Sequence, residues 1–299
     1  MGFPKMDWFA LPQPIQQVFM DRFGAPTAFE PTGDGRSPLL GTLHLPHGKR
    51  LFVKGLPEVH DQVDRLDLER RINPFVRRVT PGYRSRIVRA GWNILLFDYI
   101  SDARYPLFTQ AKDMRRILRS VRKIPTLKCK RSILPTATDR WRDFVRYPSD
   151  PDLLDGDVLL HTDFYWKNFL LREGLVYVLD WATACRGAAF IEAAMLLNRC
   201  IEYGLTIESA EAAVAKLPAW EAATDAAVDA FTWANLNRWH ALLADLDVKR
   251  HRVMYRVAYE YATYRLGAHL VAGSFPPPRA TDDPRNDQSP ALTSAEVTM

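Results

Sequence analysis

The residues best suited to chemistry lie in one stretch that begins at His161, continues through Asp163 to Asn168 and is followed by Asp180. Two apolar runs separated by a turn at Gly174 join Asn168 to Asp180, a pattern that predicts a β-hairpin. The open ends of a hairpin lie close together, so Asn168 and Asp180 are placed to share one metal ion. Their side-chain oxygens are hard ligands of the kind that Mg²⁺ prefers.

Asp163 stands one loop before this hairpin, where its carboxylate can meet a substrate hydroxyl. Phosphoryl transfer needs a group that orients the nucleophile, together with a metal ion on the phosphates. The spacing therefore predicts a phosphotransferase site in which Asp163 is the base and Asn168 and Asp180 are the metal ligands.

A second set of candidates lies in the first third of the chain. Phe52 and Lys54 share one face of a predicted strand because strand side chains alternate. Glu69 lies three residues after Leu66 on the inner stripe of the next predicted helix. A lysine held by a glutamate can be aimed at phosphate oxygens. The alternative is an ordinary lysine on an edge strand.

A loop with Gly33 and Gly35, with Gly41 further on, can approach an anion through its backbone N–H groups because glycine has no Cβ. The loop fits neither the G-x-G-x-x-G nor the Walker A pattern, so a plain surface turn explains it nearly as well.

Periodicity and turn residues divide the chain into a sheet-rich front and a helical back. We expect a helix over Gln13–Phe23, strands at 39–45 and 51–54, a helix over 59–72, two strands within 87–100 and a helix over 107–121. Helical segments separated at Gly204 and Pro218 follow from 191 to 269. These elements predict an N-terminal nucleotide-binding lobe (1–100), a helical catalytic and acceptor-binding lobe (101–272) and a disordered tail (273–299).

The charge is uneven along the 299 residues. The whole chain carries +5, yet the stretch from Asp150 to Ala230 holds 14 acidic and 5 basic residues. Basic residues crowd 65–89 and 112–131, which favours solvated helix faces over a polyanion-binding surface. The sequence has no apolar run long enough to span a bilayer and no signal peptide, and its three cysteines lack metal-ligand spacing. We therefore expect a cytoplasmic protein without membrane or nucleic-acid partners.

These residues together resemble the aminoglycoside phosphotransferase family of the kinase-like superfamily. The resemblance is carried by Lys54 and Glu69, by the run from His161 to Asn168, and by Asp180 within Val-Leu-Asp-Trp-Ala. Residues 186–192 also resemble the corresponding segment of actinobacterial members.

The resemblance implies an α+β, protein-kinase-like fold with a small antiparallel-sheet lobe and a larger, mostly helical lobe. It further implies that Mg²⁺ and ATP, or GTP, serve the reaction, that Lys54 touches the nucleotide phosphates, and that Glu69 positions Lys54. The adenine would stack beside a hinge near Phe97 and Tyr99. His161 would brace the catalytic loop, Glu192 would be structural, and the enzyme would be a monomer.

Two departures argue against a protein kinase. Trp181-Ala182 follows the metal aspartate in place of Phe-Gly, and no A-P-E element follows. The leading interpretation is thus a small-molecule kinase acting on a hydroxyl.

The acidic stretch around the motif favours a cationic acceptor such as an aminoglycoside or a related antibiotic, and hence a role in antibiotic resistance. Candidate acceptor-binding acids are Glu202, Asp225, Asp229 and Glu260. Two alternatives stay open: a metabolic kinase of small alcohols with the same fold, and a non-catalytic polyanion-binding protein.

Overall fold

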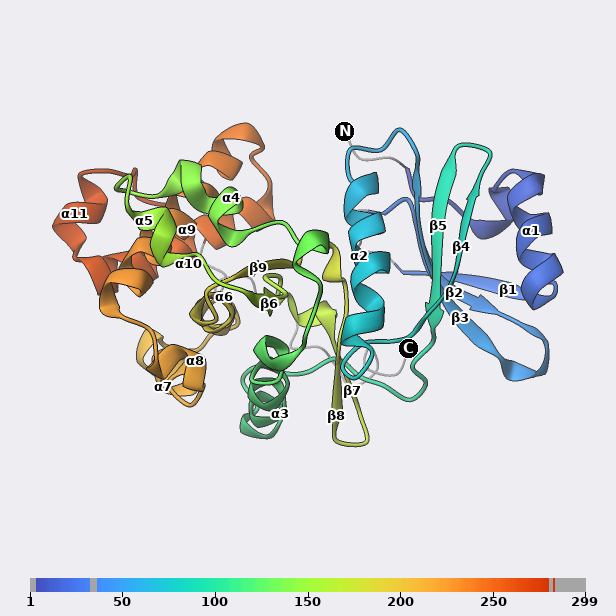
Figure 1. Ribbon diagram of the computed structural model, residues 1–299, viewed down its shortest axis with the longest axis horizontal. Helices are drawn as coiled ribbons and strands as arrows, with labels where there is room; N and C mark the ends of the chain where they lie inside the picture. The colour runs from blue at the N-terminus through green and yellow to red at the C-terminus, as the bar shows by residue number, and fades with distance from the viewer. Residues whose placement is uncertain (1–3, 33–36, 280–281, 283–299) are drawn as a thin grey trace. The chain divides into compact units, whose positions relative to one another are not determined.

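The computed structural model describes residues 4–32, 37–279 and 282. The chain divides into two compact units (Figure 1). The first comprises the chain up to Ala103 together with Leu179–Ala182. The second comprises Arg104–Val178 and the chain from Thr183 onward.

A five-stranded antiparallel sheet forms the first unit, with strand order β1-β2-β3-β5-β4. Its elements are α1 (Gln13–Phe23), β1 (Ala28–Pro31), β2 (Leu39–His44), β3 (Arg50–Pro57), α2 (Val63–Val76), β4 (Tyr83–Arg89) and β5 (Trp92–Asp98). Figure 1 shows α1 and α2 on opposite faces of the sheet. The predicted antiparallel sheet is therefore confirmed.

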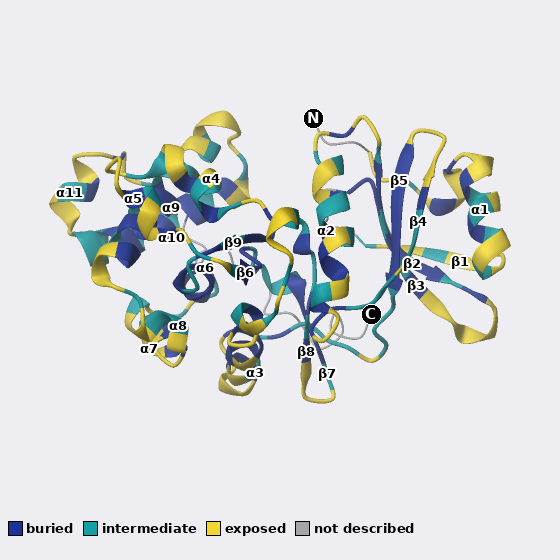
Figure 2. Ribbon diagram, viewed as in Figure 1, coloured by how far each residue is buried: buried dark blue, intermediate teal, exposed yellow. Residues whose placement is uncertain are grey.

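Side chains along the central strands point alternately to the two faces of the sheet, so the core is divided into two clusters. Val53, Ile94 and Leu96 pack with Ile15 and Phe19 of α1. A second cluster lies on the other face of the sheet, beneath α2. It consists of Leu56, Leu66, Leu95 and Phe97 with the partly buried Phe52 and Tyr83. Both faces of β5 are consequently buried, as Figure 2 shows. Phe52 and Lys54 share the α2 face, as predicted.

Helix α2 begins later than the sequence predicted. We expected it from Val59, but Val59 lies before the helix and is 86% exposed, so its place in the apolar stripe was wrong. The His60 N–H donates to the Pro57 carbonyl and closes a turn there, which delays the first helical residue to Val63. Leu66 and Glu69 are buried as predicted.

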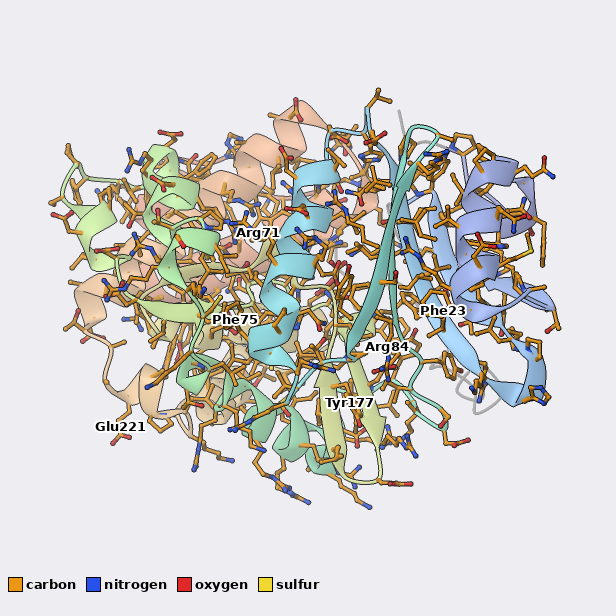
Figure 3. The ribbon with its side chains drawn as sticks, turned by 45° about the vertical axis from the view of Figure 1, so that its right-hand side comes forward. Phe23, Arg71, Phe75, Arg84, Tyr177 and Glu221 are labelled. Carbon is orange, nitrogen blue, oxygen red and sulfur yellow. The ribbon has the colours of Figure 1, made fainter. Side chains whose placement is uncertain are left out.

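Helix α2 and strand β4 carry exposed arginines. Figure 3 shows Arg71 and Phe75 on α2 and Arg84 on β4; the two arginines are exposed. One face of α2 thus meets solvent, while the opposite face carries Leu66 and Glu69 toward the sheet.

The second unit is mostly helical. Its helices are α3 (Ala111–Val121), α4 (Ala137–Trp141), α5 (Asp150–Leu153), α6 (Phe190–Glu202), α7 (Ile207–Val214), α8 (Pro218–Glu221), α9 (Asp225–Asp245), α10 (Lys249–Leu266) and α11 (Ala268–Ala272). Its strands are β6 (Val158–Leu160), β7 (Phe169–Arg172), β8 (Leu175–Val178) and β9 (Cys185–Gly187). The predicted breaks are confirmed, because Gly204 lies beyond the end of α6 and Pro218 opens α8. None of the described helices combines the length and hydrophobicity that a membrane span requires.

Helix α6 is buried along nearly its whole length, from Phe190 to Ile201. It packs against α7, α9 and α10. A helix that is buried on all sides must be surrounded by other elements, and α6 therefore forms the centre of the second unit.

The predicted hairpin after Asn168 is confirmed as β7 and β8, paired from Phe169 opposite Val178 to Arg172 opposite Leu175. The two turn residues, Glu173 and Gly174, both have positive φ, as two-residue hairpin turns require.

The predicted tail lies mostly outside the described residues. Its beginning differs from the prediction, because Phe275 is buried against α9, α10 and α11. The Tyr255 hydroxyl also donates to the Pro276 carbonyl at 2.5 Å. These contacts fix the chain immediately after α11.

Arg104, at the start of the second unit, is held by an ion pair through its side chain and by the hairpin through its backbone. The Arg104 guanidinium donates to both oxygens of Asp113, at 2.6 and 2.7 Å, and Asp113 is fully buried. Asp113 also accepts the Leu107 N–H, so the chain before α3 forms a loop and the helix begins at Ala111, later than the predicted residue 107. The Arg104 backbone bonds Leu171 of β7 in both directions.

We predict that Asp113→Ala lowers the free energy of unfolding by about 2–3 kcal/mol, because it leaves the Arg104 charge without its partner. The loss stays below that of a fully buried pair since the Arg104 side chain is 35% exposed. The matched control is Asp157→Ala, whose exposed carboxylate pairs with Arg131 and Arg186, and it should cost no more than about 1 kcal/mol. Equal losses in urea denaturation would contradict this ranking.

Candidate active site

Lys54 lies at the centre of a three-part ion-pair cluster in the first unit. Its ammonium Nζ donates to Glu69 Oε2 at 2.8 Å and to Asp180 Oδ1 at 2.7 Å. The three residues come from β3, from α2 and from the short segment Leu179–Ala182. The sequence predicted Lys54 and Glu69 as a pair, and the structure brings Asp180 to the same ammonium.

Electrostatics keep this lysine charged. Burial alone would lower the pKa of Lys54, but the carboxylates of Asp180 and Glu69 outweigh burial and hold that pKa above its ordinary value. The Lys54 side chain is 12% exposed, whereas that of Asp180 is 43% exposed. Lys54 is thus a fixed positive charge beside a carboxylate that is open to further ligands.

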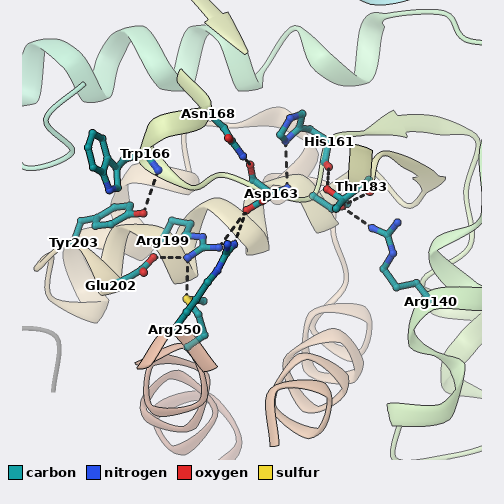
Figure 4. Close-up of polar contacts among 12 residues, drawn as sticks. Arg140, His161, Asp163, Trp166, Asn168, Thr183, Arg199, Glu202, Tyr203 and Arg250 are labelled. Carbon is teal, nitrogen blue, oxygen red and sulfur yellow. Dashed lines mark hydrogen bonds and ion pairs between the residues drawn. The ribbon is translucent and has the colours of Figure 1, made fainter. Parts of the chain in front are cut away.

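The loop from His161 to Asn168 follows β6 and is held by its own side chains (Figure 4). The Asp163 N–H donates to His161 Nδ1 at 3.2 Å, and the His161 ring stacks on Phe164. The Asn168 amide nitrogen donates to the Asp163 carbonyl at 3.0 Å. The carbonyl oxygen Oδ1 is then the hard donor that Asn168 can offer to a cation.

Glu192 on α6 anchors the start of this loop. Its Oε1 accepts the N–H groups of His161 at 2.6 Å and of Thr162 at 3.0 Å. Thr162 has a φ of +64°, in the left-handed region that costs a branched residue free energy. The two hydrogen bonds help to hold this strained turn, in agreement with the structural role that the resemblance implied for Glu192.

Arg140 and Thr183 complete the anchor. Arg140 donates to the Thr162 hydroxyl at 2.6 Å, and this hydroxyl donates to the Thr183 carbonyl at 2.7 Å. The Thr183 hydroxyl in turn donates to the His161 carbonyl at 3.1 Å. Sequence reasoning missed both residues, since neither belongs to a motif.

Two arginines contact the predicted base. Asp163 Oδ1 accepts from Arg199 of α6 and from Arg250 of α10, each at 3.3 Å. Burial would raise the pKa of Asp163, but the charges of Arg250 and Arg199 outweigh it and hold that pKa below its ordinary value. Asp163 is therefore ionised at neutral pH.

The sequence predicted neither arginine. A signal existed for Arg199, because a lone arginine within the apolar run of α6 must find a buried partner. None existed for Arg250, which follows Asp163 by 87 residues.

The acids predicted to attract a cationic acceptor are all paired with arginines. Glu202 accepts from Arg199 at 2.5 Å, and Glu260 accepts from Arg256 at 2.9 Å. Asp225 and Asp229 both contact Arg265, at 2.9 and 2.6 Å. Each of these four acids therefore has a cationic partner in the fold.

All the predicted nucleotide contacts stay predictions, including those of Lys54 and Glu69. Phe97 is buried beneath α2, with its ring edge toward Tyr83. The Arg50 guanidinium covers the ring of Tyr99, 4.2 Å from its centroid. Gly33 and Gly35 lie outside the described residues.

Gly41 is not part of a phosphate loop. It lies within β2, opposite Val53 of β3 and Pro31 of β1. A Cβ at this position would lie 2.3 Å from the Glu30 carbonyl oxygen, so close strand packing explains this glycine.

A divalent metal would need ligands beyond the protein. Among the described residues, no group of three or more His, Cys, Asp or Glu side chains could hold one. Mg²⁺ commonly takes one or two protein oxygens and completes its coordination with substrate phosphates and water. Asn168 and Asp180 each carry an oxygen of this kind, and their role as Mg²⁺ ligands stays a prediction.

Comparison with known proteins agrees with this chemistry. Residues 104–231 match the family model APH, the phosphotransferase enzyme family, over somewhat less than half of the chain. No curated protein sequence matches the chain significantly.

Solved kinase structures resemble the chain in fold. Choline kinase LicA from Streptococcus pneumoniae is 13% identical with a TM-score of 0.54, over 87% of this chain and 98% of that one. The amicoumacin kinase hAmiN, solved with AMP-PNP, Ca²⁺ and Ami, is 11% identical with a TM-score of 0.53, over 83% and 93%. A ternary complex of aminoglycoside phosphotransferase APH(4)-Ia with ADP and hygromycin B is 11% identical with a TM-score of 0.52, over 88% and 99%. The chain thus has the kinase-like fold that the sequence predicted.

We predict that Glu192 makes stability fall as pH rises. Burial raises the pKa of Glu192 to about 8 from an ordinary value of 4.5, although the Thr162 and His161 N–H groups oppose this shift. Between these values the folded protein keeps a proton that the unfolded chain releases, so the free energy of unfolding decreases with rising pH. Glu192→Gln still offers an oxygen to both N–H groups but cannot titrate, so it should flatten this slope.

Urea denaturation at several pH values between 5 and about 8 measures the slope. The exposed Glu221→Gln is the control and should keep the wild-type slope. An unchanged slope in Glu192→Gln would show that this carboxyl does not carry the pH dependence.

Proposed function

We propose that the protein is an ATP-dependent kinase that transfers the γ-phosphoryl group to a hydroxyl of a small molecule. The observation that carries the proposal is the contact of one buried lysine with two carboxylates from separate segments, Glu69 and Asp180. Phosphoryl transfer depends on fixed charges of this kind, because its loose transition state needs positioning and electrostatic stabilisation more than covalent chemistry.

In this proposal Lys54 meets the phosphates of the nucleotide as a point charge. Glu69 holds the ammonium from the α2 side and limits its motion. The proposal assigns Lys54 and Glu69 to the nucleotide, together with the backbone near Phe97 and Tyr99. The complexes of hAmiN with AMP-PNP and of APH(4)-Ia with ADP support ATP over GTP as the donor.

Asn168 and Asp180 are the proposed ligands of Mg²⁺. Asn168 directly precedes β7, and Asp180 follows the end of β8 by two residues. The antiparallel pairing of Phe169 with Val178 supports this assignment, because the two residues flank the paired ends of the hairpin. When bound, Mg²⁺ neutralises phosphate charge.

Asp163 is the proposed base. Its lowered pKa makes it a weak proton acceptor in the ground state, so its main role is to orient the acceptor hydroxyl by accepting its hydrogen bond. A loose transition state requires little proton removal before the phosphoryl group moves, which is compatible with this role.

The proposal does not require a cationic, antibiotic-like acceptor. Choline, amicoumacin and aminoglycoside kinases among the similar structures support a small-molecule acceptor in general. All four acids named as candidates for binding a cationic acceptor contact arginines, which weakens the case for such an acceptor. A role in antibiotic resistance would follow only from an antibiotic acceptor.

We predict that Asp163→Asn lowers kcat on the order of 10²–10⁴-fold and leaves nucleotide affinity nearly unchanged, because Asp163 acts on the acceptor. A coupled assay of ADP release over a panel of hydroxyl compounds measures turnover, and calorimetry measures nucleotide binding. Asp157→Asn is the control for loss of one carboxylate outside the site. Wild-type turnover in the purified Asp163 variant would refute the assignment.

We predict that Asp180→Ala abolishes the Mg²⁺ dependence of ATP binding and that Asn168→Ala weakens it less. A carboxylate supplies charge to a hard cation, whereas an amide supplies only a dipole. Lys54→Ala serves as the comparison, since it should weaken ATP binding while its Mg²⁺ dependence persists. Calorimetric titrations of ATP at several Mg²⁺ concentrations distinguish the three variants, and an unchanged metal dependence in all of them would leave the hairpin a structural role only.

A further inference from the structure

The two arginines on Asp163 differ in what they can offer a ligand (Figure 4). The Arg199 side chain is 2% exposed, and it also donates to Glu202 at 2.5 Å and to the sulfur of Met254 at 3.0 Å. The Arg250 side chain is 41% exposed, and within the described part of the chain its ion pair is with Asp163. Arg199 is thus committed to the interior, and Arg250 is open to solvent beside the base.

Arg250 has donors to spare. A guanidinium carries five N–H groups in a plane, and the contact to Asp163 is a single one at 3.3 Å. The Arg250 guanidinium lies 5.3 Å from the ring centroid of Tyr165, which fixes it over a flat surface. Such a planar fork matches the two oxygens of a carboxylate or a phosphate.

The surroundings of Arg250 favour an anion. It is the second residue of α10, whose first turn holds no acidic residue and whose N-cap, Val248, makes no side-chain cap. The positive end of the helix dipole therefore adds to the charge of Arg250. The neighbouring Arg252 is already paired with Asp247 and Asp282.

We propose that Arg250 determines acceptor specificity by binding an oxyanion, a carboxylate or a phosphate, that the acceptor carries near the hydroxyl to be phosphorylated. The inference rests on the proposed function, because it places the acceptor at Asp163. On binding, Arg250 exchanges its contact with Asp163 for the oxyanion. Asp163 Oδ1 then has room to accept a hydrogen bond from the acceptor hydroxyl.

Binding is tested first, without turnover. The arginine Nε–Hε signals of the full-length, ¹⁵N-labelled protein with Mg·ADP are followed by NMR, and the Arg250 signal is assigned by its loss in Arg250→Lys. D-glycerate and inorganic phosphate are the anionic probes, and glycerol and choline are the neutral and cationic ones, all at constant ionic strength. We expect one or both anions to shift the Arg250 signal and the other two probes to leave it unchanged.

The anion that shifts the Arg250 signal shows whether the site prefers a carboxylate or a phosphate. The same titration of Arg252→Ala, which removes an equal charge two residues away, should give the wild-type response. If neither anion moves the Arg250 signal, or if choline moves it as much, the inference is overturned.

Turnover is tested second, with hydroxyl compounds that bear a carboxylate or a phosphate and with their uncharged and cationic analogues. We expect the best acceptor to be anionic. Arg250→Ala should raise its KM about tenfold to hundredfold, because hydrogen bonds to charged groups are strong, and should leave the KM of ATP unchanged. Arg250→Lys should fall between, since lysine keeps the charge without the fork.

The two proposals can fail separately. A cationic best acceptor whose KM is unchanged in Arg250→Ala overturns the inference and leaves the kinase assignment standing. Anion-induced shifts of Arg250 without phosphorylation of any compound refute the kinase assignment and support the anion site.

Discussion

The arrangement of the site depends on one buried carboxyl group. Glu192 Oε1 holds the N–H groups of His161 and Thr162 and thereby fixes the turn that presents Asp163. Its other oxygen is buried without a hydrogen-bond partner among the described residues, so this anchor costs desolvation free energy. Arg140 adds a charge near the same turn, through the Thr162 hydroxyl. The loop that carries Asp163 is therefore held from the buried helix α6.

The charged side chains of the candidate site are paired with groups of opposite charge. The largely buried Lys54 contacts the buried Glu69 and the partly exposed Asp180, and Asp163 lies against two guanidinium groups. A buried charge is tolerated only with a partner, so each of these groups limits the position of the others. Fixed charges of this kind suit a reaction whose barrier is lowered mainly by electrostatics. They also make the environment of the base cationic on the side of Arg250.

The sequence by itself determined those features that depend only on residues close together along the chain. Alternation placed Lys54 with Phe52 on one face of β3, and helical spacing placed Glu69 beside Leu66. Two apolar runs around a glycine turn specified the hairpin after Asn168. Side chains that lie two residues apart on a strand, or three to four apart on a helix, share a face. The local geometry of the element therefore fixes where these side chains lie. The sheet and the helical second unit followed from the same patterns.

Only the tertiary structure decided which distant side chains meet those residues. Arg199 and Arg250 lie 36 and 87 residues beyond Asp163, and no local period relates them to it. The packing of α6 against α10 brings both to the same carboxylate. The net charge of the acidic stretch is incomplete for the same reason, since a count along the chain omits arginines such as Arg265 that the fold places beside the acids. The sequence thus determined the local elements that carry the candidate residues, and the fold decided which charges lie beside them, because charge pairing acts through space rather than along the chain.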